Sequence, residues 1–125
     1  MLPAVEASTA AIAAELGLAV LTPALGLAPG ADAEMAVEVT NRLASPLRGE
    51  AQLVSPFGSW ESLGPWTQGL QAGPGERVTV RFRGRIPATA RPGTQWWALV
   101  KVMYFGRVRY SAAVPVTVTS GPGGA

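Results

Sequence analysis

The sequence predicts an all-β protein, built as a sandwich of two sheets. Residues 77–83 read Arg-Val-Thr-Val-Arg-Phe-Arg, and this unbroken alternation of polar and apolar residues is typical of a strand with one buried face. The 125 residues include 15 glycines and 11 prolines, and turn residues this frequent between short strands are typical of sandwiches. Charged residues make up only 14% of the chain against a usual share of about 25%, which favours one folded domain over a disordered chain.

The predicted strands follow one another at short intervals, separated by turns such as Pro29-Gly30 and Pro74-Gly75. In chain order they cover residues 18–21 with 24–27, 34–40, 47–54, 70–72, 77–83, 95–104 and 107–118. The first two pieces are expected to form one edge strand bent at Pro23, because proline is tolerated where no ladder donor is needed. About seven antiparallel strands at this spacing predict an immunoglobulin-like sandwich, without the cysteine pair of antibody domains.

The inward face of the long strand 95–104 depends on Lys101. Burying an unpaired lysine is costly, so the opposite face, which includes Trp96, should be the core face. Phe105-Gly106 is predicted to be a two-residue hairpin loop. Across the hairpin, alternate residues of 107–118 are expected to point inward: Val108, Tyr110, Ala112, Val114, Val116 and Val118.

The ends of the chain differ from its middle. We expect the sandwich to cover residues 17–119, residues 1–16 to be either a short helix or a linker, and the Gly/Pro-rich residues 120–125 to be a flexible tail. A signal peptide is not expected, because no lysine or arginine precedes Arg42. The uncharged residues 16–31 are too few for a membrane span and contain prolines, so membrane insertion is not expected either.

The residue types argue against catalysis. The chain contains no histidine and no cysteine, which excludes histidine-based triads, thiol nucleophiles and ordinary zinc sites. Asp32 is the only aspartate, so an aspartate-rich calcium loop is not expected. Glu34 and Glu38 lie on one strand face, where they are read as surface residues and not as a glycosidase pair. We therefore predict a protein that is not an enzyme, with no catalytic residue, metal or cofactor.

A row of arginines is expected to be neutralised by neighbouring carboxylates. In an immunoglobulin-like sandwich, the strand carrying Arg77, Arg81, Arg83 and Arg85 lies beside the strand carrying the two glutamates. Cross-strand ion pairs then explain the row, and the net charge of the chain is only +2. Nucleic acid is therefore not an expected partner.

Residues 55–69 form a long segment with an unusual share of aromatic residues. Phe57, Trp60 and Trp66 lie there, and Trp97 points away from the core face of its strand. These four residues are the candidate interaction surface. Three readings stay open for the loop aromatics: a platform for stacking sugars, a small core beneath the loop, or a contact with a partner domain. Because the segment is so apolar, we expect it to fold onto the sandwich or to include a short strand near residues 60–63.

Several short motifs occur in an order that resembles the NPCBM-associated (alpha-galactosidase-associated) family of immunoglobulin-like domains. They are Pro29-Gly30, Val39-Thr40-Asn41, Pro56-Phe57-Gly58-Ser59-Trp60, Pro74-Gly75, and Pro87 followed by Pro92-Gly93-Thr94. The resemblance covers roughly residues 18–118. The chain departs from the pattern by one extra residue before Trp60, and by Gln95-Trp96-Trp97 where a tyrosine commonly follows the last motif.

The resemblance implies a non-catalytic accessory domain of a secreted or surface bacterial protein, with a glycoside hydrolase as the expected parent. Such a domain packs against or spaces other modules, so the expected partners are other domains of the parent protein, and the expected location is extracellular or at the cell surface. The alternative is a carbohydrate-binding module that uses the loop aromatics to bind polysaccharide. The family supplies no catalytic residues to carry over.

Overall fold

The computed structural model describes residues 15–56 and 58–120. Within them the chain forms ten strands and folds as an all-β sandwich of two sheets. The strands are β1 (Leu16–Val20), β2 (Leu25–Leu27), β3 (Asp32–Asn41), β4 (Leu47–Val54), β5 (Glu61–Ser62), β6 (Thr67–Ala72), β7 (Arg77–Arg85), β8 (Gln95–Tyr104), β9 (Arg107–Tyr110) and β10 (Val114–Val118).

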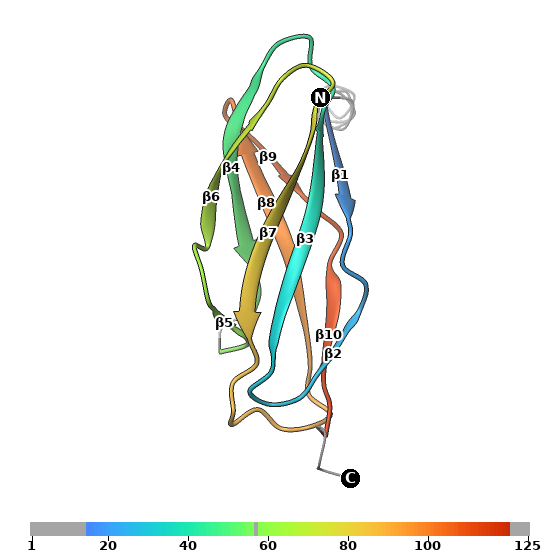
Figure 1. The fold of residues 1–125 in the computed structure, drawn as a ribbon, viewed down its shortest axis with the longest axis vertical. Coiled ribbons are helices and arrows are strands. Elements are labelled where there is room, and N and C mark those ends of the chain that lie inside the picture. Colours follow the sequence, from blue (N-terminus) through green and yellow to red (C-terminus); the bar gives the residue numbers. More distant parts are fainter. Residues whose placement is uncertain (1–14, 57, 121–125) are drawn as a thin grey trace, which may run out of the picture.

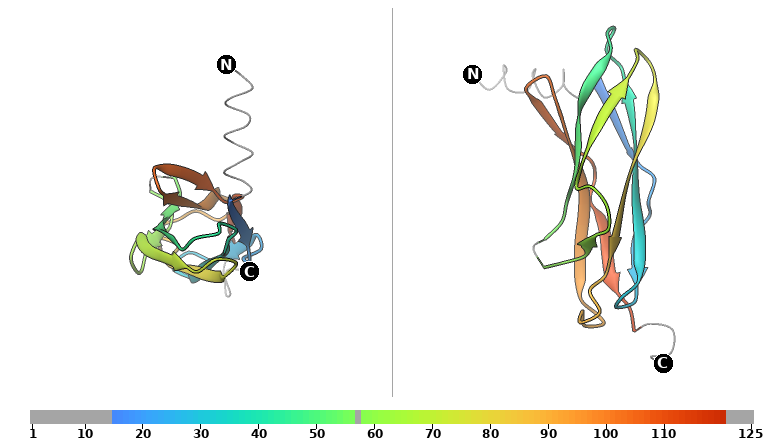
Figure 2. Two further views of the ribbon diagram at one scale, coloured as in Figure 1. Left: turned by 90° about the horizontal axis from the view of Figure 1, so that it is seen from above. Right: turned by 60° about the vertical axis from the view of Figure 1, so that its left-hand side comes forward.

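The two sheets face each other along the whole length of the molecule. One sheet has the order β1-β3-β7-β5, and the other has the order β2-β10-β8-β4-β6, with β9 also paired to β8 (Figures 1 and 2). The predicted fold class is confirmed, with more strands than the seven or so expected. One pair, β2 with β10, is parallel where the prediction was antiparallel throughout. The expectations for residues 1–14 and 121–125 lie outside the described residues.

The first predicted strand is bent at Pro23, as expected, and the bend has a structural purpose. β1 pairs with β3 in one sheet, whereas β2 pairs with β10 in the other. The crossing segment between them is fixed by Thr22, whose Oγ1 accepts a hydrogen bond from the Ala36 amide at 2.7 Å. One stretch of chain therefore lines an edge of both sheets.

The core lies between the sheets and is made of the inward residues of every long strand. The predicted inward faces of β3, β4 and β8 are confirmed, for example at Val37, Leu53 and Val100. Trp96 faces inward but is only half-buried and packs against the core from its margin. The tryptophan enclosed between the sheets is Trp60, with 4% of its surface exposed.

The prediction for β9 was wrong. Phe105 and Gly106 both have positive φ, 47° and 75°, and form the expected two-residue turn. Such a turn pairs Tyr104 with Arg107, so Val108 and Tyr110 project from the outer face. Ala112, also expected inside, is exposed as well.

One additional residue between β9 and β10 then brings the alternate residues of β10 back to the inward face. Tyr110 pairs with Lys101, and Val114 pairs with Ala98, so the chain advances four residues against three on β8. This is the two-against-one arrangement of a β-bulge. Ser111 occupies the break, where its Oγ accepts a hydrogen bond from the Val100 amide at 2.9 Å. From Val114 onward the alternate valines are buried, as predicted.

Candidate interaction surface

The outer face of the β1-β3-β7-β5 sheet is ionic. Arg81 donates to Glu34 at 2.7 Å and Arg85 donates to Asp32 at 2.8 Å. The predicted ion pair between the arginine row and Glu34 is therefore present. Glu38 lies opposite Thr79 instead of an arginine. Asp32 is a partner of the row that the sequence did not predict. The hydrogen bond from Arg85 holds the pKa of the Asp32 carboxyl below its usual value.

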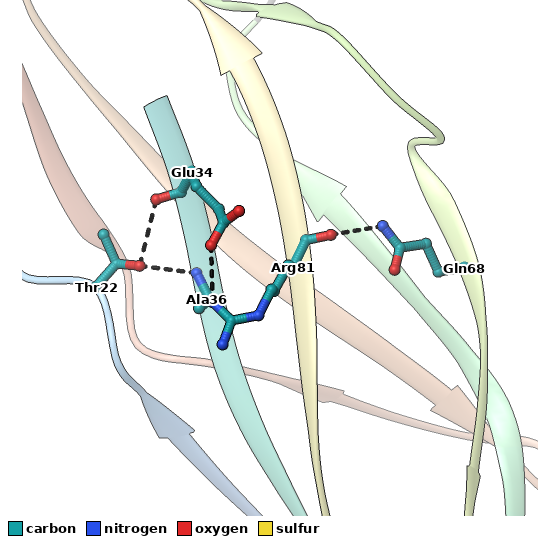
Figure 3. A network of polar contacts seen from close by, with 5 residues as sticks. All are labelled: Thr22, Glu34, Ala36, Gln68 and Arg81. Atoms are coloured by element: carbon teal, nitrogen blue, oxygen red, sulfur yellow. Dashed lines mark hydrogen bonds and ion pairs between the residues drawn. The ribbon is translucent and has the colours of Figure 1, made fainter. Parts of the chain in front are cut away.

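Further contacts tie this ionic face to its surroundings. Gln68 of β6 donates from Nε2 to the Arg81 carbonyl at 2.6 Å and so links the two sheets along one side (Figure 3). On the other side of the same network, Thr22 bridges the Glu34 carbonyl and the Ala36 amide. With Arg81 and Arg85 in ion pairs and charged side chains along β3 and β7, this face has the properties of an ordinary solvated surface.

The outer face of the other sheet is apolar along β8, β9 and β10. Register places Met103 beside Val108, Lys101 beside Tyr110 and Trp97 beside Pro115. Trp97, Val108 and Tyr110 are 41%, 42% and 56% exposed, and Leu99 and Met103 are half-buried. We call this set the apolar strip: Trp97, Leu99, Met103, Val108, Tyr110 and Pro115. Lys101 is the one charged side chain that β8 contributes to this face.

Residues 58–66 lie along one side of the sandwich, where β5 is the edge strand of the β1-β3-β7-β5 sheet. The short strand β5 pairs with Gly84 and Arg85 of β7, which confirms the predicted extra strand near residues 60–63. Trp60 then lies across Gly84, where an added Cβ would come within 2.8 Å of the indole. The gap lined by Trp60, Trp96 and Trp97 is too small for a water molecule, and the indole N–H of Trp60 has no hydrogen-bond partner.

Beside the buried Trp60 lies a surface depression of about 500 Å³. Trp66 forms one side of it and is 51% exposed, while its carbonyl accepts a hydrogen bond from the Leu53 amide. The other lining residues are Ser55, Pro56, Gly58, Ser59, Trp60, Glu61 and Ser62. The depression combines an exposed aromatic ring with hydroxyl and carboxylate groups.

A cluster of polar contacts anchors the start of the described chain to the β8–β9 hairpin. The Glu15 carboxylate accepts a hydrogen bond from the Tyr104 hydroxyl at 3.0 Å and forms an ion pair with Arg107. Arg109 donates to the Leu16 carbonyl. We call this set, Glu15, Tyr104, Arg107 and Arg109, the N-terminal clasp. Its hairpin side chains lie on the inward face of the β8–β9 hairpin, opposite the face that carries Val108 and Tyr110.

The clasp predicts a pH-dependent stability. The hydrogen bond from Arg107 lowers the pKa of Glu15, so the carboxylate stabilises the fold above its unfolded pKa of about 4.3 and loses this effect as the pH falls through the lower folded value. We expect Glu15→Gln to lower the thermal midpoint at pH 7, and the difference from the parent chain to shrink below about pH 4. Glu50→Gln, on the exposed outer side of β4, is the control and should change little. A deficit that stays constant from pH 7 to pH 3 would contradict this role of the carboxylate.

The four residues of the predicted interaction surface are found in three different environments. Trp66 and Trp97 are exposed, Trp60 is in the core, and Phe57 lies outside the described residues. Val108 and Tyr110 were predicted to point inward and were therefore missed as surface residues. The two-residue turn at Phe105-Gly106 carried the signal for both, because it forces Arg107 to share the face of Tyr104.

In the part of the chain that the structure describes, no group of three or more histidine, cysteine, aspartate or glutamate residues could hold a metal ion. No helix among the described residues is long and apolar enough to cross a membrane.

Comparison with known proteins supports the fold and leaves the family open. No known sequence family matches the chain, and no curated protein matches it either. Among solved structures it resembles a fragment of alpha-2-macroglobulin from Escherichia coli that spans domain MG7 to the C-terminus, with a TM-score of 0.66 and 14% identity over 84% of this chain and 17% of that one. A FixG-related protein from Vibrio parahaemolyticus gives a TM-score of 0.60 and 12% identity, covering 83% of this chain and 96% of that one.

A family 123 glycoside hydrolase from Clostridium perfringens, described for glycolipid glycan hydrolysis, also resembles the chain. The TM-score is 0.59 and the identity 11%, over 83% of this chain and 27% of the hydrolase. Identities this low show a shared fold only. The chain is thus an immunoglobulin-like sandwich, and it spans only a fraction of the alpha-2-macroglobulin fragment and of the hydrolase.

Proposed function

We propose that this immunoglobulin-like chain is a non-catalytic accessory domain that docks through its apolar strip against another part of the polypeptide that carries it. The observation that carries the proposal is the contrast between its two outer faces. One face pairs Arg81 with Glu34 and Arg85 with Asp32. The other face exposes Val108 and Tyr110 in adjacent rows and Trp97 further along β8.

The physical argument rests on the cost of leaving such a strip in water. Soluble proteins rarely expose large contiguous apolar patches unless the patch is an interaction site. Fully burying a large apolar side chain contributes about 1.5–3 kcal/mol, so covering even two of the strip residues gives a useful docking energy. Docking also needs few hydrogen bonds here, because the backbone of β8 is already paired with its neighbours on both sides.

The shape of the domain supports a role as a spacer as well. β1 begins near one end of the long axis, and β10 leads to the opposite end (Figure 1). The chain therefore enters and leaves at opposite ends, as a module between other modules would require.

The parent is proposed to be a secreted or surface bacterial protein, and a glycoside hydrolase in particular. The motif order that resembles the NPCBM-associated family supports this, as does the likeness to a segment of a family 123 glycoside hydrolase. The non-catalytic role is supported by the residue types: Asp32, the only aspartate, is held by Arg85, and Glu34 is held by Arg81. No cofactor is proposed.

Docking is tested by thermal unfolding of the domain alone and within the full polypeptide. We expect docking to raise the unfolding midpoint of the domain within the full polypeptide. The double substitution Trp97→Ser with Tyr110→Ser should abolish that rise, while it should barely change the unfolding midpoint of residues 1–125 alone. Leu21→Ser removes an equally exposed apolar side chain outside the strip and serves as the matched control. An increment that survives the double substitution, or is lost equally with the control, would refute docking through this strip.

A second candidate function is polysaccharide binding at the depression beside Trp66. An exposed indole with Ser59, Glu61 and Ser62 around it combines a stacking surface with groups that orient hydroxyls. Titration of soluble polysaccharides against tryptophan fluorescence tests it. A saturable change lost in Trp66→Ala, with the fold intact, would support sugar binding, and no change with any polysaccharide would exclude it as the role of this depression.

A further inference from the structure

The strand β6 is an edge strand whose backbone is paired on one side only within the described part of the chain. It ends the six-stranded sheet, where it pairs with β4, and it lies at the margin of the molecule in Figure 1. The register, together with the bond from the Leu53 amide to the Trp66 carbonyl, directs the backbone groups of the even-numbered residues of β6 toward β4. The N–H and C=O groups of Thr67, Gly69 and Gln71 therefore point away from the sheet, and all three residues are exposed.

β6 lacks the features that prevent edge strands of soluble proteins from pairing with other chains. Such features are charged side chains, prolines, β-bulges and very short strands. β5 and β2 have only two and three residues, β9 contains two arginines and ends at the bulge, and a carbonyl of β1 accepts a hydrogen bond from Arg109. β6 has six residues, Thr-Gln-Gly-Leu-Gln-Ala, without charge or proline, and its register with β4 is unbroken. An edge of this kind is a template for one more strand.

The outward backbone groups of β6 are arranged symmetrically about Gly69. In a second β6 placed antiparallel, with the two glycines opposite each other, Thr67 of each chain lies opposite Gln71 of the other. Every outward N–H then meets a C=O, which gives up to about six hydrogen bonds between the chains. Because β6 carries no charge, no like charges oppose each other in this register. The strand is therefore complementary to a second copy of itself.

We infer that β6 is a dimerisation edge, at which a second copy of this chain pairs antiparallel and joins the two six-stranded sheets into one. The two-fold axis of such a pair is perpendicular to the joined sheet, so both outer faces stay on the same side. The apolar strip lies on β8, β9 and β10, and β4 separates it from β6, so pairing leaves the strip uncovered. The inference thus goes beyond the proposed docking function and does not depend on it.

Sedimentation velocity of residues 1–125 tests the pairing. The mass should rise from 12.9 kDa toward about twice that value, and no further, as the concentration increases, because a two-fold contact is closed. Gly69→Pro removes an N–H that the ladder to β4 does not use, and proline is tolerated on that side of an edge strand. It should weaken association roughly tenfold or more, because the two central hydrogen bonds are lost.

Gly69→Ala is the matched control for the proline variant. It keeps the N–H, and an added Cβ at this position meets nothing within 4 Å, so this variant should associate like the parent chain. Circular dichroism and thermal unfolding would establish that both variants keep the fold. A parent chain that stays monomeric at millimolar concentration, or a folded Gly69→Pro variant that dimerises as the parent does, would overturn the inference.

A pair of charge variants keeps the test independent of any effect of proline on folding. Gly69→Lys and Gly69→Glu each place like charges opposite each other at the two-fold axis, so each alone should associate more weakly than the parent chain. Mixed in equal amounts, the two variants should associate more tightly than either does alone, because opposite charges then meet. A mixture whose association is only the average of the two would contradict pairing at β6.

Hydrogen exchange locates the contact on the molecule. At a concentration where about nine-tenths of the chains are paired, the Gly69 amide should exchange roughly tenfold more slowly than in dilute solution. Val108 is the control, because its amide also points away from its sheet, next to the Tyr104–Arg107 pair of the β8–β9 turn. Its exchange rate should not depend on concentration. Slowing at Val108 and not at Gly69 would move the dimer contact to the apolar strip and overturn the inference.

Discussion

Trp60→Ala should destabilise the domain by about 3–5 kcal/mol, the usual cost of deleting a large buried aromatic side chain. Trp60 is enclosed between the sheets, and its ring lies against the backbone of Gly84. Because backbone cannot move in to fill the space, the cavity would persist. A loss of this size is a large part of the 5–15 kcal/mol that ordinary domains possess. Urea unfolding followed by circular dichroism measures it.

Two matched substitutions separate burial from other effects of the indole. Trp66→Ala removes the same side chain from an exposed position and should cost less than about 1 kcal/mol. Trp60→Phe keeps a ring over Gly84 and removes an N–H that has no partner, so it should cost well under half as much as Trp60→Ala. A larger loss of unfolding free energy for Trp66→Ala than for Trp60→Ala would contradict the burial of Trp60 in the core.

Asn41→Ala should cost about 3 kcal/mol, because several buried polar groups would lose their partner at once. Asn41 ends β3 and is fully buried. Its Nδ2 donates to the carbonyls of Ser45, Ala72 and Gly73 at 3.0–3.1 Å, and its Oδ1 accepts from the Leu43 amide at 2.9 Å. One side chain thus joins the end of β3 to the turns on both sides of it.

The conservative test is Asn41→Asp. Aspartate can still accept from the Leu43 amide with one oxygen, but the oxygen that replaces Nδ2 would face three carbonyl oxygens, so it should not restore stability at pH 7. Thr40→Ala, next to it but half-exposed, should change the unfolding free energy by less than about 1 kcal/mol. A stable Asn41→Ala variant would mean that water satisfies these carbonyls as well as the amide does.

The fold could be predicted because each strand shows its buried face as an alternation of apolar and polar residues in its own sequence. Lys101 fixed the phase of β8, and that phase is correct to Tyr104. The same reasoning failed one strand later, because alternation was continued through residues 107–118 as if they were one strand. The bulge near Ser111 adds a residue, and a bulge has no signature in an apolar–polar pattern.

The surface was harder to predict than the fold. Trp60 and Trp66 belong to one apolar segment, and only the pairing of β5 with β7 decides which of them is enclosed. Glycine at position 84 provides the space for the indole, but this contact joins residues far apart in the sequence. The N-terminal clasp likewise joins Glu15 to Arg107, which no local pattern reveals.

The most direct test of docking through the apolar strip is the rate at which single cysteines are alkylated in the full polypeptide. Trp97 and Leu21 are similarly exposed in the domain, at 41% and 51%, and only Trp97 belongs to the strip. If the strip is covered, Trp97→Cys should be alkylated roughly tenfold more slowly than Leu21→Cys, which corresponds to a site occupied about nine-tenths of the time. Equal alkylation rates at the two positions would contradict docking through the apolar strip.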